Sequence, residues 1–191
     1  MLFPQYPLKY SGAWSVVGVA SSERLNGAKQ LIQDHAIAYY NKNLTIYISK
    51  SHPTDQNNIS WQMIGFQKRK KPAKDFENKA TSDVVKDIVS LAENWDDAVT
   101  EIISSSERVL PKQLYHTEPL PSWSLGRTAL IGDAVHTTSP LTGYGTSFAL
   151  EDGMYLAKML KEHDYPDAFY YYEYDRRERV ELIKETAKEF F

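Results

Sequence analysis

The stretch ALIGDAVHTTSPLTGYGTSFALED, residues 129–152, decides how the fold of the chain is interpreted. An apolar run ends in Gly-Asp, a polar loop with a proline follows, and Gly-x-Gly precedes a helical pattern. The pattern predicts a strand over residues 126–133 and a helix over residues 146–161. We expect Asp133 at the end of that strand, where a carboxylate can accept hydrogen bonds from sugar-type hydroxyls.

The start of the predicted helix is suited to an electron-rich ligand. Gly143 and Gly145 let the backbone approach a ligand without an intervening Cβ. The amides of Gly145, Thr146 and Ser147 would be free, because the first N–H groups of a helix have no internal acceptor. With the positive end of the helix dipole, these donors favour a negative group. On spacing alone, the alternative is an ordinary loop in which Thr146 caps the helix.

The composition excludes several classes of protein. The chain has 191 residues, 42% of them hydrophobic, which is typical of a globular protein. The net charge of −3 gives no reason to expect a nucleic-acid partner. There are no cysteines, and no two of the five histidines have the helical spacing of a metal site, so we expect no bound metal. With no signal peptide or apolar membrane span visible, we expect a cytoplasmic protein without a membrane partner.

The rest of the chain predicts strands and helices in mixed order. Strands are predicted over residues 13–20, 44–50, 59–67 and from residue 112, with residues 52–58 as a longish hairpin loop. Residues 25–32 have helical spacing. A helix over residues 81–95 would be capped by Thr81 or Ser82, a second short helix follows it, and a long helix starts near Pro166. The basic run at residues 68–74 is interpreted as a solvated connector.

Three finer expectations concern the last two helices. The first would bury a stripe of Ala149, Leu150, Leu156, Ala157 and Leu160, and Gly153 would mark a close packing contact. The carboxylates of Glu151 and Asp152 are adjacent on a helix and would point apart. In the last helix, Glu173–Arg177 and Asp175–Arg179 have i,i+4 spacing, so its arginine cluster would be a solvated, self-paired face.

Residues 126–160 closely resemble the second flavin-contacting motif of the FAD-dependent aromatic-ring monooxygenases. These are the group A flavoprotein hydroxylases, typified by salicylate and para-hydroxybenzoate hydroxylases. The residues that match the motif are Gly126, Arg127, Gly132, Asp133, Ala134, His136, Pro140, Gly143, Gly145, Glu151 and Asp152. PLPSW upstream and YYEYDRRERV downstream are also similar to the family, and residues 14–95 resemble its substrate domain more loosely.

This resemblance implies a set of cofactor contacts. Asp133 would hold the ribityl hydroxyls of FAD, and the amides of Thr146 and Ser147 would face the pyrimidine edge of the flavin. Ser147 stands where the family often has Asn, so only its backbone contact is implied. The remaining cofactor-binding residues would be Gly132, Pro140, Gly143 and Gly145.

The resemblance also implies where a substrate would lie. Pro140 and Leu141 would line the flavin ring beside it, and Tyr47, Trp61 and Met63 could project from the hairpin into the same cavity. For the last three residues, core packing is the alternative. No side chain is assigned a catalytic role, because the flavin would perform the chemistry. His136 would shape the loop rather than act as a base.

The resemblance implies a mixed α/β (α+β) fold in two parts. Residues 1–115 would form a substrate-domain-like β-sheet with helices, and residues 116–191 the C-terminal part of an FAD-binding domain. The family's N-terminal Rossmann βαβ unit, with its Gly-x-Gly-x-x-Gly motif, has no counterpart, since the only Gly-x-Gly is Gly143–Gly145. The chain therefore resembles the C-terminal half of the family, and the missing N-terminal half is a candidate partner.

The reaction implied is hydroxylation of an aromatic or similar small molecule. NAD(P)H would reduce FAD, and dioxygen would form a flavin C4a-hydroperoxide that transfers oxygen to the substrate. We expect the chain alone to be inactive. Two alternatives stay open: a non-catalytic truncated remnant or partner-binding module, and a flavin-dependent epoxidase or other oxidase.

Overall fold

The computed structural model describes residues 2–28, 36–52, 54–66 and 76–188. These residues form two compact units. The sheet unit is Gly12–Leu114, and the helical unit combines Met1–Ser11 with Tyr115–Phe191. The sequence placed a division at residues 115/116 but did not indicate that Met1–Ser11 groups with the C-terminal part.

The sheet unit is built on five strands in the order β2-β3-β4-β1-β5. The strands are β1 (Lys9–Ser21), β2 (Ile37–Tyr40), β3 (Leu44–His52), β4 (Asp55–Phe66) and β5 (Ser106–His116). The pairs β1/β4, β3/β4 and β2/β3 are antiparallel, which confirms the predicted hairpin. Its loop is shorter than predicted, because β3 continues to His52 and β4 already begins at Asp55.

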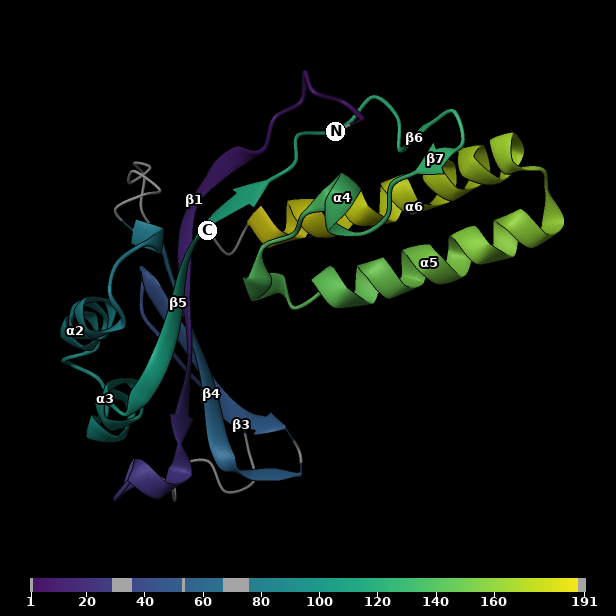
Figure 1. The fold of residues 1–191 in the computed structure, drawn as a ribbon. Helices are drawn as coiled ribbons and strands as arrows, with labels where there is room; N and C mark the ends of the chain where they lie inside the picture. The colour runs from purple at the N-terminus through teal and green to yellow at the C-terminus, as the bar shows by residue number, and fades with distance from the viewer. Residues whose placement is uncertain (1, 29–35, 53, 67–75, 189–191) are drawn as a thin grey trace. The chain divides into compact units, whose positions relative to one another are not determined.

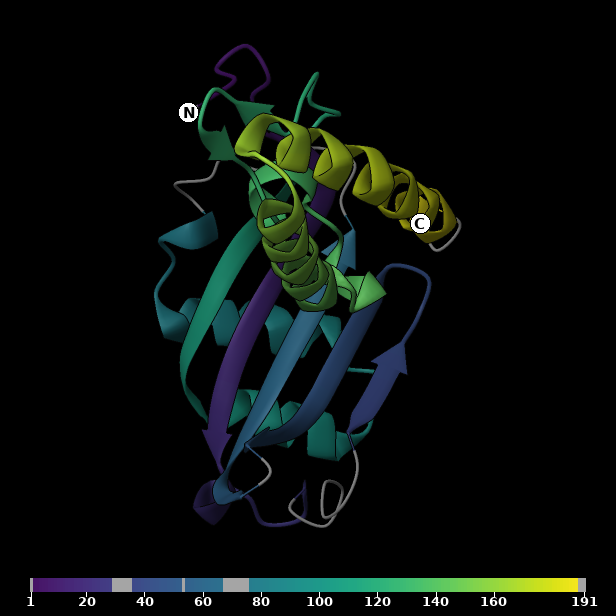
Figure 2. The same ribbon diagram turned by 90° about the vertical axis from the view of Figure 1, so that its right-hand side faces the viewer.

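Two helices, α2 (Thr81–Leu91) and α3 (Asp97–Ser104), cover one face of this sheet (Figure 1). Figure 2 shows the strands in front of these helices. Alternating strand residues such as Val16, Ile46 and Met63 pack with Ile88 and Ile102 in one core. The α3 helix is capped by Asp96, whose side chain accepts from the amide of Ala98. The predicted cap of α2 is wrong, because its N-cap is Ala80 and carries no side-chain hydrogen bond.

Two tryptophans of this core each lie across a glycine of the neighbouring strand. Gly18 of β1 pairs with Trp61 of β4, and Trp14 pairs with Gly65. A Cβ placed at Gly18 would come within 2.5 Å of the Trp61 indole, so only glycine leaves room for the ring. Trp61 Nε1 donates to Ser106 Oγ at 2.8 Å, which fixes the indole inside the core.

The helical unit is dominated by two long helices that run antiparallel (Figure 1). Its elements are β6 (Ser124–Leu125), β7 (Thr128–Ala129), α4 (Asp133–His136), the 3-10 helix η3 (Pro140–Thr142), α5 (Gly145–Glu162) and α6 (Tyr165–Lys188). Its core contains Leu120, Trp123, Val135, Tyr172 and Val180. The two units together have the mixed α+β fold predicted from the sequence.

The predicted strand over residues 126–133 is confirmed only at Thr128–Ala129, which form β7. Gly126 and Arg127 instead form the turn of the short β6/β7 hairpin, and Asp133 is the first residue of a one-turn helix. The helical spacing predicted for residues 25–32 falls partly on residues 29–35, outside the described part. Before that gap, Ser22–Arg24 is a 3-10 helix, and after it Ile37–Tyr40 is a strand. The basic run at residues 68–74 lies outside the described residues.

The buried side of α5 also differs from the predicted stripe. Its buried residues are Phe148, Asp152 and Met159, whereas Leu150 is 65% and Leu160 45% exposed. Gly153 marks no close contact, since, apart from its chain neighbours and the backbone of its own helix, no described atom lies within 4 Å of a Cβ at this position. The side of α5 opposite to α6 is therefore apolar and exposed.

The glycine–tryptophan packing predicts a large stability effect. We expect Gly18→Ala to lower the free energy of unfolding by about 1–3 kcal/mol, because the buried Trp61 ring must leave its position. Gly153→Ala is the matched control and should raise it by about 0.5–1 kcal/mol, since it adds helix propensity in open space. Urea unfolding of both variants measures this. Equal stability of Gly18→Ala and the wild type would contradict it.

Candidate functional site

The predicted Gly-Asp turn packs directly on α5. Gly132 has φ 55°, a conformation that favours glycine, and it is the N-cap of α4. A Cβ at Gly132 would lie 2.9 Å from the Cβ of Ala149, so a larger residue would also push the turn away from the helix. Asp133 follows as the first residue of α4, and its side chain is exposed. The turn therefore presents a carboxylate to solvent from a buried support.

The N-terminus of α5 offers free donors next to this turn. Among the described residues, none accepts a hydrogen bond from the amides of Thr146 and Ser147, and both residues are exposed. The N-cap, Tyr144, makes no side-chain cap. Gly143, with φ 68°, closes the preceding loop by donating its amide to Pro140 O at 3.1 Å. The start of this long helix is thus an open site for a negative group.

A buried carboxylate, Asp152, joins the turn to α5. Asp152 is 0% exposed, and its Oδ2 accepts from the amide of Gly132 at 2.8 Å. His136 Nε2 lies 2.6 Å from the same oxygen. Because an ionised carboxylate can only accept, His136 carries its proton on Nε2 in this pair. One oxygen therefore holds both ends of α4 against α5.

The other oxygen of Asp152 faces α6. Arg176 Nε donates to Asp152 Oδ1 at 3.0 Å, and Arg176 Nη1 donates to Glu151 Oε2 at 2.6 Å. Arg179 makes two hydrogen bonds of 2.9 Å to Glu151. The expectation that the two carboxylates point apart is therefore wrong, because both bind Arg176. Of the predicted i,i+4 pairs, Glu173–Arg177 is confirmed, but Arg179 pairs with Glu151 rather than with Asp175.

The pKa of Asp152 shows the balance of forces in this network. Burial alone would raise it, but the hydrogen bonds from His136 and from the amide of Gly132, with the charge of His136 and the bond from Arg176, outweigh burial. The pKa of Asp152 is therefore held below its ordinary value of 3.8. Nearby, burial first and then the charge of Asp152 raise the pKa of Tyr172, whose hydroxyl donates to Leu130 O at 3.0 Å.

A pair of threonines, Thr117 and Thr137, holds the segment that directly follows α4. Thr137 Oγ1 accepts from the amide of Thr117 at 2.7 Å, and Thr117 Oγ1 accepts from the amide of Thr137 at 3.2 Å. Thr117 Oγ1 also donates to Val135 O at 3.1 Å. These hydrogen bonds anchor the α4 end of the loop between α4 and η3 to Thr117.

The helical unit brings most of the predicted cofactor residues into one region. Gly132 packs on α5 one turn beyond Thr146 and Ser147, and a Cβ at Gly145 would lie 3.3 Å from Thr138 Oγ1 in the same loop. Pro140, in η3, is exposed, and the side chain of Leu141 lies outside the described part.

The predicted substrate residues of the hairpin belong to the sheet unit. Trp61 and Met63 are 1% and 0% exposed and pack in its core, which is the predicted alternative to a substrate contact. Tyr47 is 40% exposed and points to the opposite face of the sheet from its neighbours Ile46 and Ile48. A substrate contact stays a prediction, and of the three only Tyr47 has exposed surface for it.

Sequence reasoning missed the support of the site. Asp152 and Arg176 are 24 positions apart, and nothing in the local pattern links them. One feature of the sequence could have indicated this support. Asp152 is a charged residue one turn before Leu156, on the side of α5 that packs against α6. A carboxylate on the buried side of an amphipathic helix requires a partner.

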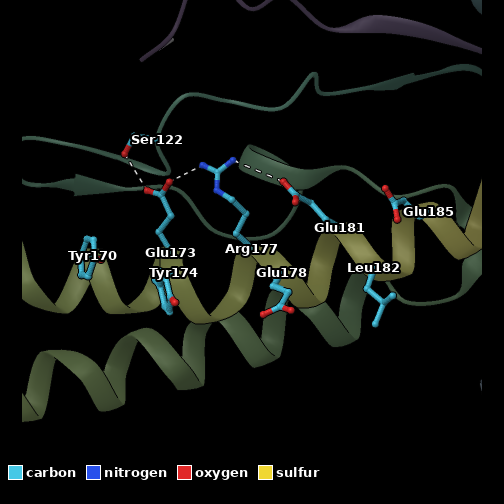
Figure 3. A pocket seen from close by; sticks show the side chains of 9 residues that line it. All are labelled: Ser122, Tyr170, Glu173, Tyr174, Arg177, Glu178, Glu181, Leu182 and Glu185. Atoms are coloured by element: carbon cyan, nitrogen blue, oxygen red, sulfur yellow. Dashed lines mark hydrogen bonds and ion pairs between the residues drawn. The ribbon is translucent and has the colours of Figure 1, made fainter.

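A cavity of about 750 Å³ lies elsewhere in the helical unit, along α6 (Figure 3). It is lined by Ser122, Tyr170, Glu173, Tyr174, Arg177, Glu178, Glu181, Leu182 and Glu185. Four glutamates and one arginine make its wall acidic, which disfavours a phosphate-bearing cofactor. None of the predicted cofactor residues lines it, so the cavity is distinct from the Asp133 turn.

The described part of the chain meets neither the requirements of a metal site nor those of a membrane span. No group of three or more His, Asp or Glu residues there could hold a metal ion. None of the described helices combines the length and the hydropathy needed to cross a bilayer.

Comparison with known proteins decides the family. The family model described as "FAD binding domain" matches residues 5–187, nearly the whole chain. The chain belongs to the FAD binding domain family. The description of the family names FAD as the ligand of its domain.

The family's relatives include hydroxylating and epoxidising enzymes. The chain is 38% identical over 96 residues to 6-hydroxynicotinate 3-monooxygenase of Pseudomonas fluorescens. The aligned region covers 49% of this chain and 25% of that protein. It is 32% identical over 114 residues to the chloroplastic zeaxanthin epoxidase of an Oncidium hybrid cultivar, covering 53% of this chain and 17% of that protein.

The fold agrees with a solved member of this group. The structure of 2,6-dihydroxypyridine-3-hydroxylase from Arthrobacter nicotinovorans superposes with a TM-score of 0.83 at 14% identity. The superposition covers 98% of this chain and 52% of that protein. The chain thus spans about half the length of the neighbour whose fold it shares.

The lowered pKa of Asp152 predicts a loss of stability in acid. A carboxyl group with a lowered folded-state pKa stabilises the protein above its ordinary value of 3.8, and this stabilisation is lost as the pH falls through the lowered pKa. The unfolding free energy should therefore fall below about pH 4. Asp152→Asn should flatten this fall, whereas Asp167→Asn, at an exposed helix start, should keep it. Urea midpoints measured against pH test this, and identical slopes for the wild type and Asp152→Asn would refute it.

Proposed function

We propose that the chain is the part of an FAD-dependent monooxygenase that binds the flavin end of FAD. The complete protein would hydroxylate a small aromatic or heteroaromatic molecule with NAD(P)H and dioxygen. The observation that carries this proposal is the exposed Asp133 carboxylate, held by a buried turn against a helix whose first amides are free. Family membership supports FAD as the ligand of this arrangement.

The donors and acceptors present fit the flavin end of FAD. The Asp133 carboxylate accepts hydrogen bonds from the ribityl hydroxyls, which are donors along a flexible chain. The amides of Thr146 and Ser147 donate to the pyrimidine edge, and the positive end of α5 stabilises negative charge there. Gly143 is exposed, so its backbone can approach the ring. Bound FAD would supply the chemistry, accepting electrons from NAD(P)H and activating dioxygen.

The substrate side of the proposal rests on fewer groups. Pro140, exposed in η3, supplies an apolar surface beside the cofactor site. Tyr47, 40% exposed, is the proposed aromatic contact to the substrate. No side chain of this chain is proposed as an acid or base, since positioning the ring is the task left to the protein. The relative that acts on 6-hydroxynicotinate supports a heteroaromatic substrate.

Epoxidation is the second candidate reaction. It is supported by the likeness to zeaxanthin epoxidase, which matches 53% of this chain. Both reactions use the same cofactor contacts, so the product formed by the complete protein distinguishes them.

We further propose that the exposed apolar side of α5 binds the dinucleotide-binding half of the fold. Leu150 and Met154 are 65% and 76% exposed, and Gly153 between them has open space around it. An apolar helix face of this kind is typical of a surface that another element covers. The chain spans 52% of its structural neighbour, which supports the remainder of that fold as the occupant. Turnover would then require both parts, and the 191-residue chain alone would be inactive.

The cofactor proposal predicts flavin binding that depends on Asp133. We expect the chain to bind FAD saturably and Asp133→Ala to weaken binding about tenfold, because hydrogen bonds to a charged group are lost. Asp167→Ala is the matched control, an exposed aspartate in the first turn of α6, and should bind like the wild type. Flavin fluorescence titration measures the Kd. No binding by a folded wild-type chain would sink the proposal.

The docking proposal predicts an accessible hydrophobic surface on the isolated chain. We expect the dye ANS to bind and its fluorescence to drop about twofold in Leu150→Gln/Met154→Gln. Leu125→Gln/Tyr165→Gln removes two exposed apolar side chains outside this face, 54% and 40% exposed, and should keep most of the signal. If both double variants behaved alike, the α5 face would not be the binding surface.

A further inference from the structure

We propose that Asp152 is a positioning residue for the flavin site. Its buried carboxylate fixes the Gly132–Asp133 turn on α5, so that Asp133 and the free amides of α5 face one ligand. This inference rests on the proposed function. Asp152 itself is fully buried and would not touch the cofactor.

The geometry of Asp152 makes it a single point of attachment. Gly132 lies immediately before α4, and His136 is the last residue of α4. Both bind the same oxygen of Asp152, at 2.8 Å and 2.6 Å. Asp133 lies between them in the chain, so its backbone is held from both sides. A movement of the Gly132 amide would shift the carboxylate of Asp133 directly.

The chemistry of the contacts requires an acid at this position. The groups bound to the two oxygens of Asp152 are donors: the amide of Gly132, Nε2 of His136 and Nε of Arg176. An asparagine keeps one accepting oxygen, but its NH₂ group would meet at least one of these donors. Arg176 is also 6% exposed, so its charge needs the carboxylate beside it. The arrangement therefore couples the turn to α6 as well as to α5.

Side chains that hold binding groups in place affect affinity without touching the ligand. The turn has positive φ at Gly132, and its amide has Asp152 as its acceptor. Without that hydrogen bond, the turn gains freedom and the Asp133 carboxylate samples positions that do not meet the ribityl chain. The expected consequence is weaker flavin binding with the direct contacts still present.

The test compares Asp152→Asn with a matched carboxylate variant, Glu173→Gln. Glu173 also holds a backbone turn from a helix, accepting from the amide of Trp123 at 2.8 Å and from Ser122 Oγ at 2.9 Å. Its hydrogen bonds among the described residues go to Ser122, Trp123 and Arg177 and not to the Gly132–Asp133 turn. Both variants remove one buried or half-buried charge from the helical unit, but only one removes the support of Asp133.

Two readouts separate positioning from general loss of stability. Hydrogen exchange of the Gly132 amide, followed by NMR, should accelerate about tenfold in Asp152→Asn and stay unchanged in Glu173→Gln. FAD titration should show a Kd raised about tenfold in the first variant only. Exchange at core amides of α6 reports global stability and serves as the internal reference.

A second variant covers the case in which Asp152→Asn does not fold. Asp152→Ala/Arg176→Met removes the acceptor and the buried positive charge together, a change that proteins tolerate better than an unpaired charge. It should show the same faster exchange and weaker FAD binding. Unchanged exchange at Gly132 in a folded variant overturns the inference, as does faster exchange with unchanged FAD affinity. If the wild type binds no FAD, the proposed function fails, and the exchange data alone decide whether Asp152 fixes the turn.

Discussion

A carboxylate removed from water is stable only if donors surround it. Asp152 of α5 meets this constraint with donors from the turn before α4, from α4 and from α6. It accepts from Gly132 before α4, pairs with His136 at the end of α4, and binds Arg176 of α6. Desolvation opposes its charge, and the contacts with its partners more than compensate. The short helix α4 has little stability of its own, so its position depends on this carboxylate.

In this arrangement the exposed groups are available to a ligand, and the buried groups hold them in position. Asp133 and the amides of Thr146 and Ser147 face solvent, while the residues that hold them are buried or half-buried. Trp123 adds apolar support, since its ring lies 5.1 Å from His136 and 5.5 Å from Tyr172 between centroids. Rigid support below exposed polar groups is the arrangement that a binding site requires.

Local sequence predicted the elements whose signals are local. The β3/β4 hairpin follows from alternation, and α2 and α5 follow from helical apolar spacing, although the start of α2 and the buried side of α5 differ from the prediction. The start of α6 follows from Pro166 in its first turn. Residues 126–133 have the apolar run of a buried strand, but a strand needs a partner. Among the described residues, β7 pairs only with the two residues of β6. The inward carboxylate of Asp152 escaped prediction for a similar reason, because its partners come from segments distant in sequence.

The positions of the four tryptophans give the two units separate optical signals. Trp14, Trp61 and Trp95 lie in the sheet unit, whereas Trp123 is the single indole of the helical unit and is 3% exposed. Its emission therefore reports on the surroundings of His136 and Tyr172 once the other three are replaced by phenylalanine. Compared with a chain in which only Trp123 is replaced, such a chain would show whether the two units lose structure in one cooperative transition or in succession.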